Sequence, residues 1–529
     1  MKIKALLISS LLLLTSLSYA QDEFDALRIT PRDIQGTARY TAMAGAFTAI
    51  GGDASAVKDN PAALGIYRHW EATFTLGYDY KGTKTSSQGF DRNGFNNRFN
   101  ARQAGFVFNF GGKKNRTRGL ITNSLAFTYD HLYDFRRDFV TGASKEAKPS
   151  THASLTRLAA LQASTKGTVT EAMLSTENNN DPYSDLDVGW LAELGYQSFL
   201  INPQSAGGFS TLLGEDELVK SRHAISEYGG INEYGLSWGG NINNYLFIGA
   251  GIGLRTLRYR AETTYAEHFE QEGSFQIDNE YETSGVGVNF SLGVMGMPTD
   301  WLRLGASIKS VTLHNLKDYN IATSQYYITE EQKGTVTTPK GGIDYSYKFN
   351  SPMQVTAGAA FFIKSQGIIS IEYDFDRYQS LKFRDKSDAE AFTDANNAIK
   401  HAARNTHTLK IGAEYRPLEW LSIRAGYARQ TPSVERNAQR FLRHNTVRID
   451  SEYEIPQTVQ FASAGIGFRG TWWNIDLAYQ YRVYKSTFYS FAAGTYYTED
   501  LPLDDKYQAE ASDLKNQRHS ASLTFGIRF

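Results

Sequence analysis

Two clusters in the sequence have residue types suited to ligand or metal chemistry, but each lacks the context that the chemistry needs. The run Gly249-Ala250-Gly251-Ile252-Gly253 resembles a dinucleotide loop, yet it has no third spaced glycine and lies inside an alternating segment. A phosphate-binding loop instead joins a strand to a helix, so we interpret these glycines as close packing. Asp181, Asp185 and Asp187 carry oxygen ligands of the kind that calcium prefers, and a solvated acidic loop is the simpler interpretation.

The sequence shows no organised set of catalytic or metal-ligating side chains. The ten histidines include His401 and His407 in one loop, without a repeated metal spacing. There is no cysteine, which excludes thiolate zinc sites and a cysteine nucleophile. Serine, histidine and aspartate are abundant, but no Ser/His/Asp constellation stands out. We therefore predict no catalytic residue, no metal ligand and no cofactor, and a protein that is not an enzyme.

The composition indicates which kind of secondary structure would position any functional site. Lys+Arg 55 against Asp+Glu 56 gives a formal net charge of −1, which offers no basis for nucleic-acid binding. Aromatic residues make up 13% of the 529 residues and glycine contributes 46, yet the mean hydropathy is −0.42. An aromatic, glycine-rich chain that is polar on average favours many alternating strands.

Residues 1–20 have the pattern of a signal peptide. Lys2 and Lys4 precede an apolar stretch at 5–14, and Ser18 and Ala20 are the small residues of a cleavage site. The apolar stretch is shorter than the roughly 20 residues of a membrane-spanning helix, and no later stretch reaches that length. We predict export in a Gram-negative cell, to the periplasm, the medium or the outer membrane.

Residues 71–529 alternate between apolar and polar side chains in many short segments. In Ser522–Phe529, for example, Leu523, Phe525 and Ile527 share one face while Ser522 and Thr524 lie on the other. Such alternation puts one face of a strand in an apolar medium and the other in a polar one. The predicted strands are 71–80, 101–110, 120–132, 229–242, 245–262, 281–297, 301–315, 351–363, 367–378, 406–416, 419–430, 457–469, 472–488 and 514–529.

The lengths of the connections separate a membrane barrel from a soluble sandwich. Short turns such as Asn243-Asn244 alternate with long polar stretches, of which 133–228 is the longest and includes a helical pattern around Leu158. This rhythm is typical of transmembrane barrels, and it requires an even number of strands. We predict an all-β fold: a 14-stranded antiparallel transmembrane barrel, with Trp301 and Trp420 in an interfacial girdle directly after short turns.

Residues 21–70 do not alternate and are rich in alanine and glycine. A barrel of this size is wider than the roughly eight strands whose side chains fill the interior, so it needs a water channel or a plug. We predict that 21–70 forms a hatch inside the barrel, and a periplasmic domain is the alternative.

The same segment carries a recognisable motif. Gly36-x-Ala38-Arg39, Gly45-x-x-x-Ala49, Asp53 and Asn60-Pro61-Ala62 resemble the N-terminal hatch of the FadL/TodX (OmpP1) family of outer-membrane transporters. The resemblance implies a hatch-closed barrel that takes up hydrophobic molecules by diffusion and releases them sideways into the bilayer. In that family the extreme N-terminus reaches into the binding site. This chain is longer than typical members, mostly in 133–228.

Candidate ligand-binding residues follow from the lumen face and the hatch. The inward face of the predicted strands is charged, so we expect it to hold the hatch through ion pairs rather than to contact ligand. These residues are Asp79, Glu372, Asp374, Lys410, Glu414, Arg424, Asp476, Arg482 and Arg528. The pocket would then lie among apolar hatch residues, for which the candidates are Phe24, Leu27, Ile29, Phe47 and Leu64.

The sequence supports one leading hypothesis for the function and leaves three alternatives open. The leading hypothesis is a monomeric transporter of long-chain fatty acids, similar lipids or aromatic hydrocarbons, surrounded by the bilayer and lipopolysaccharide. A barrel subunit that works through partner proteins, as in type IX secretion, resembles the same family and is the first alternative. A haem receptor and an open porin are the others, and the predicted plug disfavours the porin.

Overall fold

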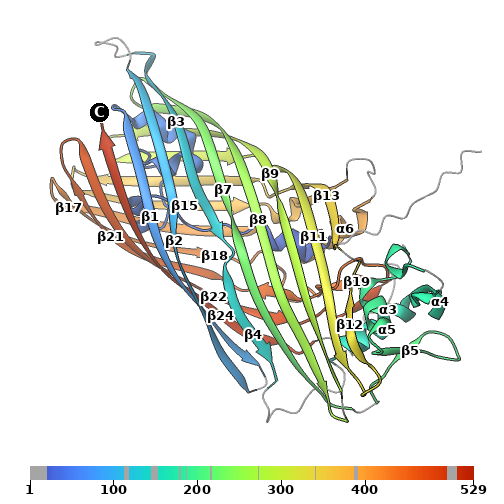
Figure 1. Cartoon of the computed structure of the whole chain (residues 1–529). Coiled ribbons are helices and arrows are strands. Elements are labelled where there is room, and N and C mark those ends of the chain that lie inside the picture. Colours follow the sequence, from blue (N-terminus) through green and yellow to red (C-terminus); the bar gives the residue numbers. More distant parts are fainter. Residues whose placement is uncertain are drawn as a thin grey trace, which may run out of the picture.

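The computed structural model is a closed, strongly tilted β-barrel (Figure 1). It describes residues 21–529 except 88, 112–117, 144–152, 178–179, 186, 215–216, 272, 340, 386–390 and 497–508. Fourteen antiparallel strands follow one another around the wall, and β24 pairs with β1 to close it. In order these are β1 (Glu71–Ser87), β2 (Phe90–Gly111), β3 (Leu120–Asp134), β7 (Val219–Ile242), β8 (Leu246–Phe269), β9 (Ser274–Thr299), β10 (Leu302–Lys309), β14 (Gln354–Ile363), β15 (Gly367–Asp376), β17 (Thr406–Leu418), β18 (Leu421–Gln430), β21 (Val459–Arg469), β22 (Trp473–Tyr489) and β24 (Ser512–Arg528).

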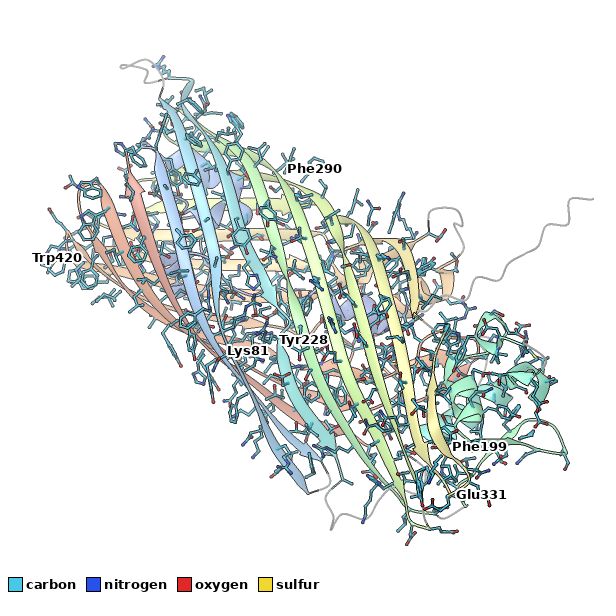
Figure 2. All side chains as sticks on the ribbon, viewed as in Figure 1. Lys81, Phe199, Tyr228, Phe290, Glu331 and Trp420 are labelled. Atoms are coloured by element: carbon cyan, nitrogen blue, oxygen red, sulfur yellow. The ribbon has the colours of Figure 1, made fainter. Side chains whose placement is uncertain are left out.

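The burial of side chains is inverted relative to a soluble protein. Phe290 and Leu292 of β9 are 55% and 60% exposed, and Phe290 projects from the outer wall (Figure 2). Ser520 and Thr524 of β24 face inward and are only 1% and 2% exposed. Apolar side chains outside and polar side chains inside are what a lipid-embedded barrel with a polar lumen requires. No described helix has both the length and the apolar character to cross a membrane.

The two ends of the barrel differ as predicted. Short turns, the C-terminus and the exposed Trp420 gather at one end (Figures 1 and 2). Trp301 and Trp472 are likewise exposed after short turns, which fits an interfacial girdle. The larger connections lie at the other end, which we take as external.

The strands extend further on the external side than the alternation predicts. The predicted loop 263–280 is mostly strand, because β8 runs to Phe269 and β9 starts at Ser274. Predicted segment 301–315 is interrupted between β10 and β11, and predicted segment 351–363 corresponds to β14, which a short break separates from β13. Outside the membrane the outward face is no longer lipid-facing, and inward residues such as Tyr265 and Phe275 are buried against the external subdomain. The apolar-outside, polar-inside alternation of the membrane-embedded part is therefore lost. The additional strands are β4 (Arg137–Gly142), β11 (Leu313–Tyr327), β12 (Lys333–Thr337), β13 (Ile343–Asn350), β16 (Lys382–Arg384) and β20 (Tyr453–Pro456).

The predicted helical pattern around Leu158 is a real helix in a small external subdomain. α3 packs on α5, and Leu158 and Trp190 are fully buried in the core they share. The external elements are α3 (Leu155–Thr165), α4 (Glu171–Leu174), η4 (Pro182–Ser184), α5 (Trp190–Gln197), β5 (Ile201–Pro203), β6 (Phe209–Thr211), η5 (Tyr378–Ser380), α6 (Thr393–Ala402), β19 (Phe441–Arg443) and β23 (Gly494–Tyr496).

Residues 21–70 lie inside the barrel, where Figure 1 shows their short blue helices behind the front strands. The segment is almost wholly buried and contains α1 (Glu23–Arg28), α2 (Ala38–Ala42), η1 (Ala54–Lys58) and η2 (Pro61–Ile66). The last three elements pack against different parts of the wall: α2 on β18, β21 and β22, η1 on β2 and β3, and η2 on β7, β8 and β9. We call residues 21–70 the hatch.

Candidate functional site

The motif residues of the hatch shape its short turns. Asn60 caps η2, since its side-chain oxygen accepts a hydrogen bond from the Ala62 amide at 3.0 Å. Its Nδ2 donates to the Thr48 carbonyl at 2.8 Å, and Pro61 occupies the first turn, where no amide donor is needed. Asp53 caps η1 in the same way.

The remaining motif glycines and alanine allow close packing. Gly45 follows α2 with φ +72°, a conformation that favours glycine. A Cβ on Gly36 would overlap Ser55, and Ala62 is fully buried against the wall near Phe247. These contacts explain why small residues recur in the segment.

A belt of inward-facing glycines on the wall receives the hatch. At each of these positions a Cβ would meet hatch atoms, so a larger residue would displace the hatch. Gly249, the centre of the glycine-rich run, approaches the Pro61 backbone from within β8, which confirms its interpretation as a packing residue. The belt consists of Gly239, Gly249, Gly293, Gly305, Gly412, Gly426 and Gly465.

Buried ion pairs join the hatch to the wall. Glu414 of β17 is unexposed and binds Arg39 of the hatch at 2.9 Å, together with Arg416 and Arg424 of the wall at 2.6 and 2.7 Å. Asp33 of the hatch binds Arg482 at 3.0 Å and also Arg518.

The other predicted inward charges divide into hatch contacts and contacts within the wall. Glu372 accepts a hydrogen bond from the Thr48 amide at 2.6 Å and pairs with Lys410, which also binds Asp374 at 2.7 Å. The remaining pairs lie within the wall. They are Asp79 with Arg102, Asp476 with Arg424, and Arg528 with Glu71.

A cavity of about 220 Å³ lies on the external side of the hatch, next to α1. Phe24 and Leu27 line it from α1. The Phe24 ring lies 4.9 Å from the Tyr453 ring. The other aromatic side chains of the lining come from the wall and the external loops, and they are Tyr133, Phe135, Phe139, Tyr259, Tyr378, Tyr484 and Phe488.

The cavity lining also carries many charges, and most of them are paired. Arg137 binds Glu227 and Glu454, each at 2.7 Å, and Arg440 binds Asp22 at 2.6 Å. Arg136 differs, because it forms no ion pair with any residue that the structure describes. Its guanidinium lies 6.0 Å from the Tyr228 ring and is the cation of the described lining that no carboxylate neutralises.

The sequence-predicted ligand residues fall into three places. Phe24 and Leu27 line the main cavity, and Ile29 lines a much smaller one of about 20 Å³ on the other side of the same segment. Phe47 and Leu64 are fully buried, Phe47 in the hatch core and Leu64 against the wall. The structure thus brings together Phe24 and Leu27 but not Phe47 and Leu64.

The first turn of α1 carries a buried charge cluster behind the cavity. Burial favours the neutral form of the Asp25 carboxyl, but Arg448 and Arg28 hold its pKa at about 2. Burial, with the neighbouring Asp22, raises the pKa of Glu23 to about 8. Asp25 is therefore an anion at neutral pH while Glu23 is mostly protonated, and the charged groups fix α1 against the external loops.

Beside the cavity the strand ladder of the wall is broken between β2 and β4, and we call this break the seam. The sequence did not predict it. β2 pairs with β1 from Phe90 to Val107, but with β3 only from Gly111 as far as Gln103 opposite Asp130. Beyond that point β3 shifts register at His131/Tyr133, and β4 pairs with β7 alone. The only sequence signal is the absence of clear alternation after residue 132.

Side-chain contacts bridge the seam. Lys81 of β1 donates to the carbonyls of Asp134 and Arg136 at 2.7 and 3.0 Å, and Asn96 of β2 donates to Asp138 of β4 at 2.8 Å. Lys81 lies near the middle of the barrel in Figure 2. Lys81 and Arg136 both line the cavity, so the cavity reaches the seam.

Within the described part of the chain, no three metal-ligating side chains gather. Of the acidic loop, Asp185 accepts a hydrogen bond from the Asp187 amide and Asp187 pairs with Lys166 at 2.6 Å. The signal-peptide prediction for 1–20 lies outside the described residues.

The closed barrel, its apolar outer band and its internal hatch define a membrane-spanning protein of the outer membrane. A family model described as "F plasmid transfer operon, TraF, protein" matches residues 152–376. No curated protein sequence matches the chain.

Three solved structures show what the fold is similar to. A FadL homologue from Pseudomonas aeruginosa aligns with a TM-score of 0.50 at 13% identity, over 94% of this chain and 99% of that one. The toluene transporters TodX of P. putida and TbuX of Ralstonia pickettii align with TM-scores of 0.48 and 0.45 at 12% and 15% identity, with the same coverage. The first of these likenesses confirms the FadL-type fold that the hatch motif implies.

Proposed function

We propose that the protein takes up hydrophobic small molecules from outside the cell and releases them sideways into the outer membrane. Uptake is passive diffusion through the cavity, and the hatch stays in place. The protein acts as a monomer, with the bilayer and lipopolysaccharide as its surroundings.

The position and lining of the cavity are the main support for this proposal. It lies between the external loops and the hatch, and aromatic and aliphatic side chains such as Phe24, Leu27 and Phe135 line it. Burial of apolar ligand surface there gains about 25 cal/mol per Å². A cavity on the path from outside, closed below by a buried hatch, favours a hydrophobic ligand over an open porin for polar solutes.

The seam supports sideways release. A strand ladder that continues without interruption leaves no gap in a barrel wall, whereas here β2 and β4 are joined by side-chain contacts rather than by a ladder. These contacts break at lower cost than a full ladder would. The cavity touches both sides of the seam, at Lys81 and at Arg136.

The charge pattern favours an amphiphile among the hydrophobic candidates. Arg136 is a cation at the edge of an aromatic cavity and has no acidic partner among the described residues. A long-chain fatty acid would place its carboxylate on Arg136 and its chain against the aromatic rings, whereas an aromatic hydrocarbon would use the rings alone. Haem remains less suited, since the described lining offers tyrosines but no histidine.

Replacing Phe24 with alanine tests the proposal. Loss of a buried apolar side chain removes about 1.5–3 kcal/mol, so ligand affinity should fall roughly tenfold to a hundredfold. Binding of a long-chain fatty acid and of toluene to the purified barrel is measured by calorimetry. Phe99→Ala, which removes a ring from the lipid-facing side of β2, is the matched control.

The outcome separates the alternatives. Unchanged affinity of Phe24→Ala for every hydrophobic ligand would refute the cavity as the binding site. A barrel that holds only water, with a protein bound at its rim, would instead favour the partner-binding function.

A further inference from the structure

Three lysines form a row on the outer face of the barrel. Lys84 of β1 lies directly opposite Lys515 of β24, and Lys515 lies directly opposite Lys485 of β22. All three are exposed. They share strand parity with the lipid-facing Leu76 and Leu477, so they point away from the lumen. Opposite residues on one sheet face have Cβ atoms about 5 Å apart, which brings three ammonium groups together.

The lysine row lies just beyond the membrane-facing band. Four residues closer to the membrane centre on the same strands, Tyr80, His519 and Tyr481 also stand opposite one another, and the Tyr481 and His519 rings lie 5.0 Å apart. Aromatic side chains of this kind mark the membrane interface. Four residues span about 13 Å along a strand, and the tilt of the strands reduces the height. The lysine row therefore stands at the level of the outer headgroups.

The lysine row lacks the compensation that other outward cations have. On the opposite wall Arg258 pairs with Glu282 at 3.2 Å and Lys317 with Asp344 at 2.8 Å. Neither an ion pair nor a side-chain hydrogen bond joins the lysine row to any described residue. The exposed Asp513 shares this face two residues from Lys515, but it forms no ion pair with the three lysines. Like charges directly opposite in a sheet are destabilising, so three lysines against one carboxylate leave an excess of positive charge that favours a bound anion.

We propose that the lysine row binds the phosphate groups of a phosphorylated glycolipid in the outer leaflet. Three adjacent strands place the outer lysines roughly 10 Å apart, since strand spacing is about 4.8 Å. A row of that length suits a headgroup with more than one phosphate. Its acyl chains would lie over the apolar rows of Leu76, Leu523 and Leu477 below. Clusters of lysine at a membrane surface attract anionic headgroups in this way.

Titration with bisphosphorylated lipid A, followed by native mass spectrometry of the full chain in detergent, tests the proposal. The triple variant K84Q/K485Q/K515Q should bind lipid A about tenfold to a hundredfold more weakly, because each lysine near an anionic surface contributes roughly tenfold or less. The matched control R258Q/K317Q/K333Q removes the same charge from ion-paired, exposed positions and should bind as the wild type does. Thermal unfolding should show that both variants are folded. The K84Q/K485Q/K515Q variant should be no less stable than the wild type, because it loses like-charge repulsion, and the control loses only exposed ion pairs.

Three results would overturn the proposal. Equal lipid A affinity of the K84Q/K485Q/K515Q variant and the wild type would show that the lysine row is not the site. Equal loss in the control would show that net charge alone is measured. Equal binding of fully dephosphorylated lipid A would show that the row does not recognise the phosphate groups. None of these results bears on the cavity, so the two proposals fail separately.

Discussion

Replacing Glu414 with alanine should release the hatch and convert the closed barrel into an ion-conducting pore. Glu414 is fully buried and holds Arg39 of the hatch, with Arg416 and Arg424 also bound to it. Removal of this carboxylate leaves Arg39 facing the buried Arg424 and the partly exposed Arg416 without the anion between them. Loss of one partner from a buried pair costs about 3–5 kcal/mol, which is large for a segment of 50 residues held by a limited set of such contacts.

Single-channel recording in planar bilayers measures this effect directly. The wild type should be closed, and Glu414→Ala should open to a large conductance. Glu419→Ala is the matched control, because Glu419 is an exposed carboxylate in the turn of the same hairpin. A Glu414→Ala barrel that stays as closed as the wild type would mean that these ion pairs do not hold the hatch.

Replacing Gly94 with leucine should disrupt the cavity while leaving the hatch closed. A Cβ on Gly94 of β2 would overlap the carbonyl oxygen of Asp138, and the Phe139 Cα lies 3.4 Å away. The larger side chain must push β4 off β2, and β4 and its approach carry Arg136 and Phe139 of the cavity lining. Ligand affinity should fall at least about tenfold, since loss of a single buried apolar contact already has that effect.

The matched control is Gly111→Leu on the same strand, where nothing lies within 4 Å of an added Cβ. Its ligand affinity should equal that of the wild type. Conductance of Gly94→Leu should stay at the closed level, in contrast to Glu414→Ala. Wild-type affinity in Gly94→Leu would contradict the assignment of the cavity wall to β4.

The membrane-embedded part of the fold is predictable from the sequence because lipid imposes a strict period of two. β24 shows this most clearly, since exposed Phe525 and Ile527 alternate with buried Ser522 and Thr524. The external parts of the strands are not predictable in this way. The predicted loop 263–280 is mostly strand, because β8 runs to Phe269 and β9 starts at Ser274. Its inward side chains, such as Tyr265 and Phe275, are buried against the external subdomain, a tertiary contact that the lipid-imposed pattern does not report.

The candidate site is predictable only where a local motif reports on it. Phe24 and Leu27 follow from the N-terminal position that the hatch resemblance implies, and both line the cavity. Phe47 and Leu64 are equally apolar, but they pack in the hatch core and against the wall. Distant contributors such as Tyr453 of β20 lie in short external strands whose placement depends on tertiary contacts, so no sequence spacing identifies them.

Tethering the hatch to the wall tests the central claim, that ligand leaves sideways while the hatch stays in place. The chain has no cysteine, so Ala54→Cys/Gly105→Cys forms a single defined disulfide. An added Cβ on Gly105 of β2 lies 3.0 Å from the Ala54 Cβ, within a small shift of the roughly 3.8 Å that a disulfide requires. Uptake of a labelled long-chain fatty acid into cells is measured before and after reduction. The account predicts equal uptake in both states. Uptake that is abolished by the disulfide and restored by reductant would show that ligand passes through the space the hatch occupies, and would contradict it.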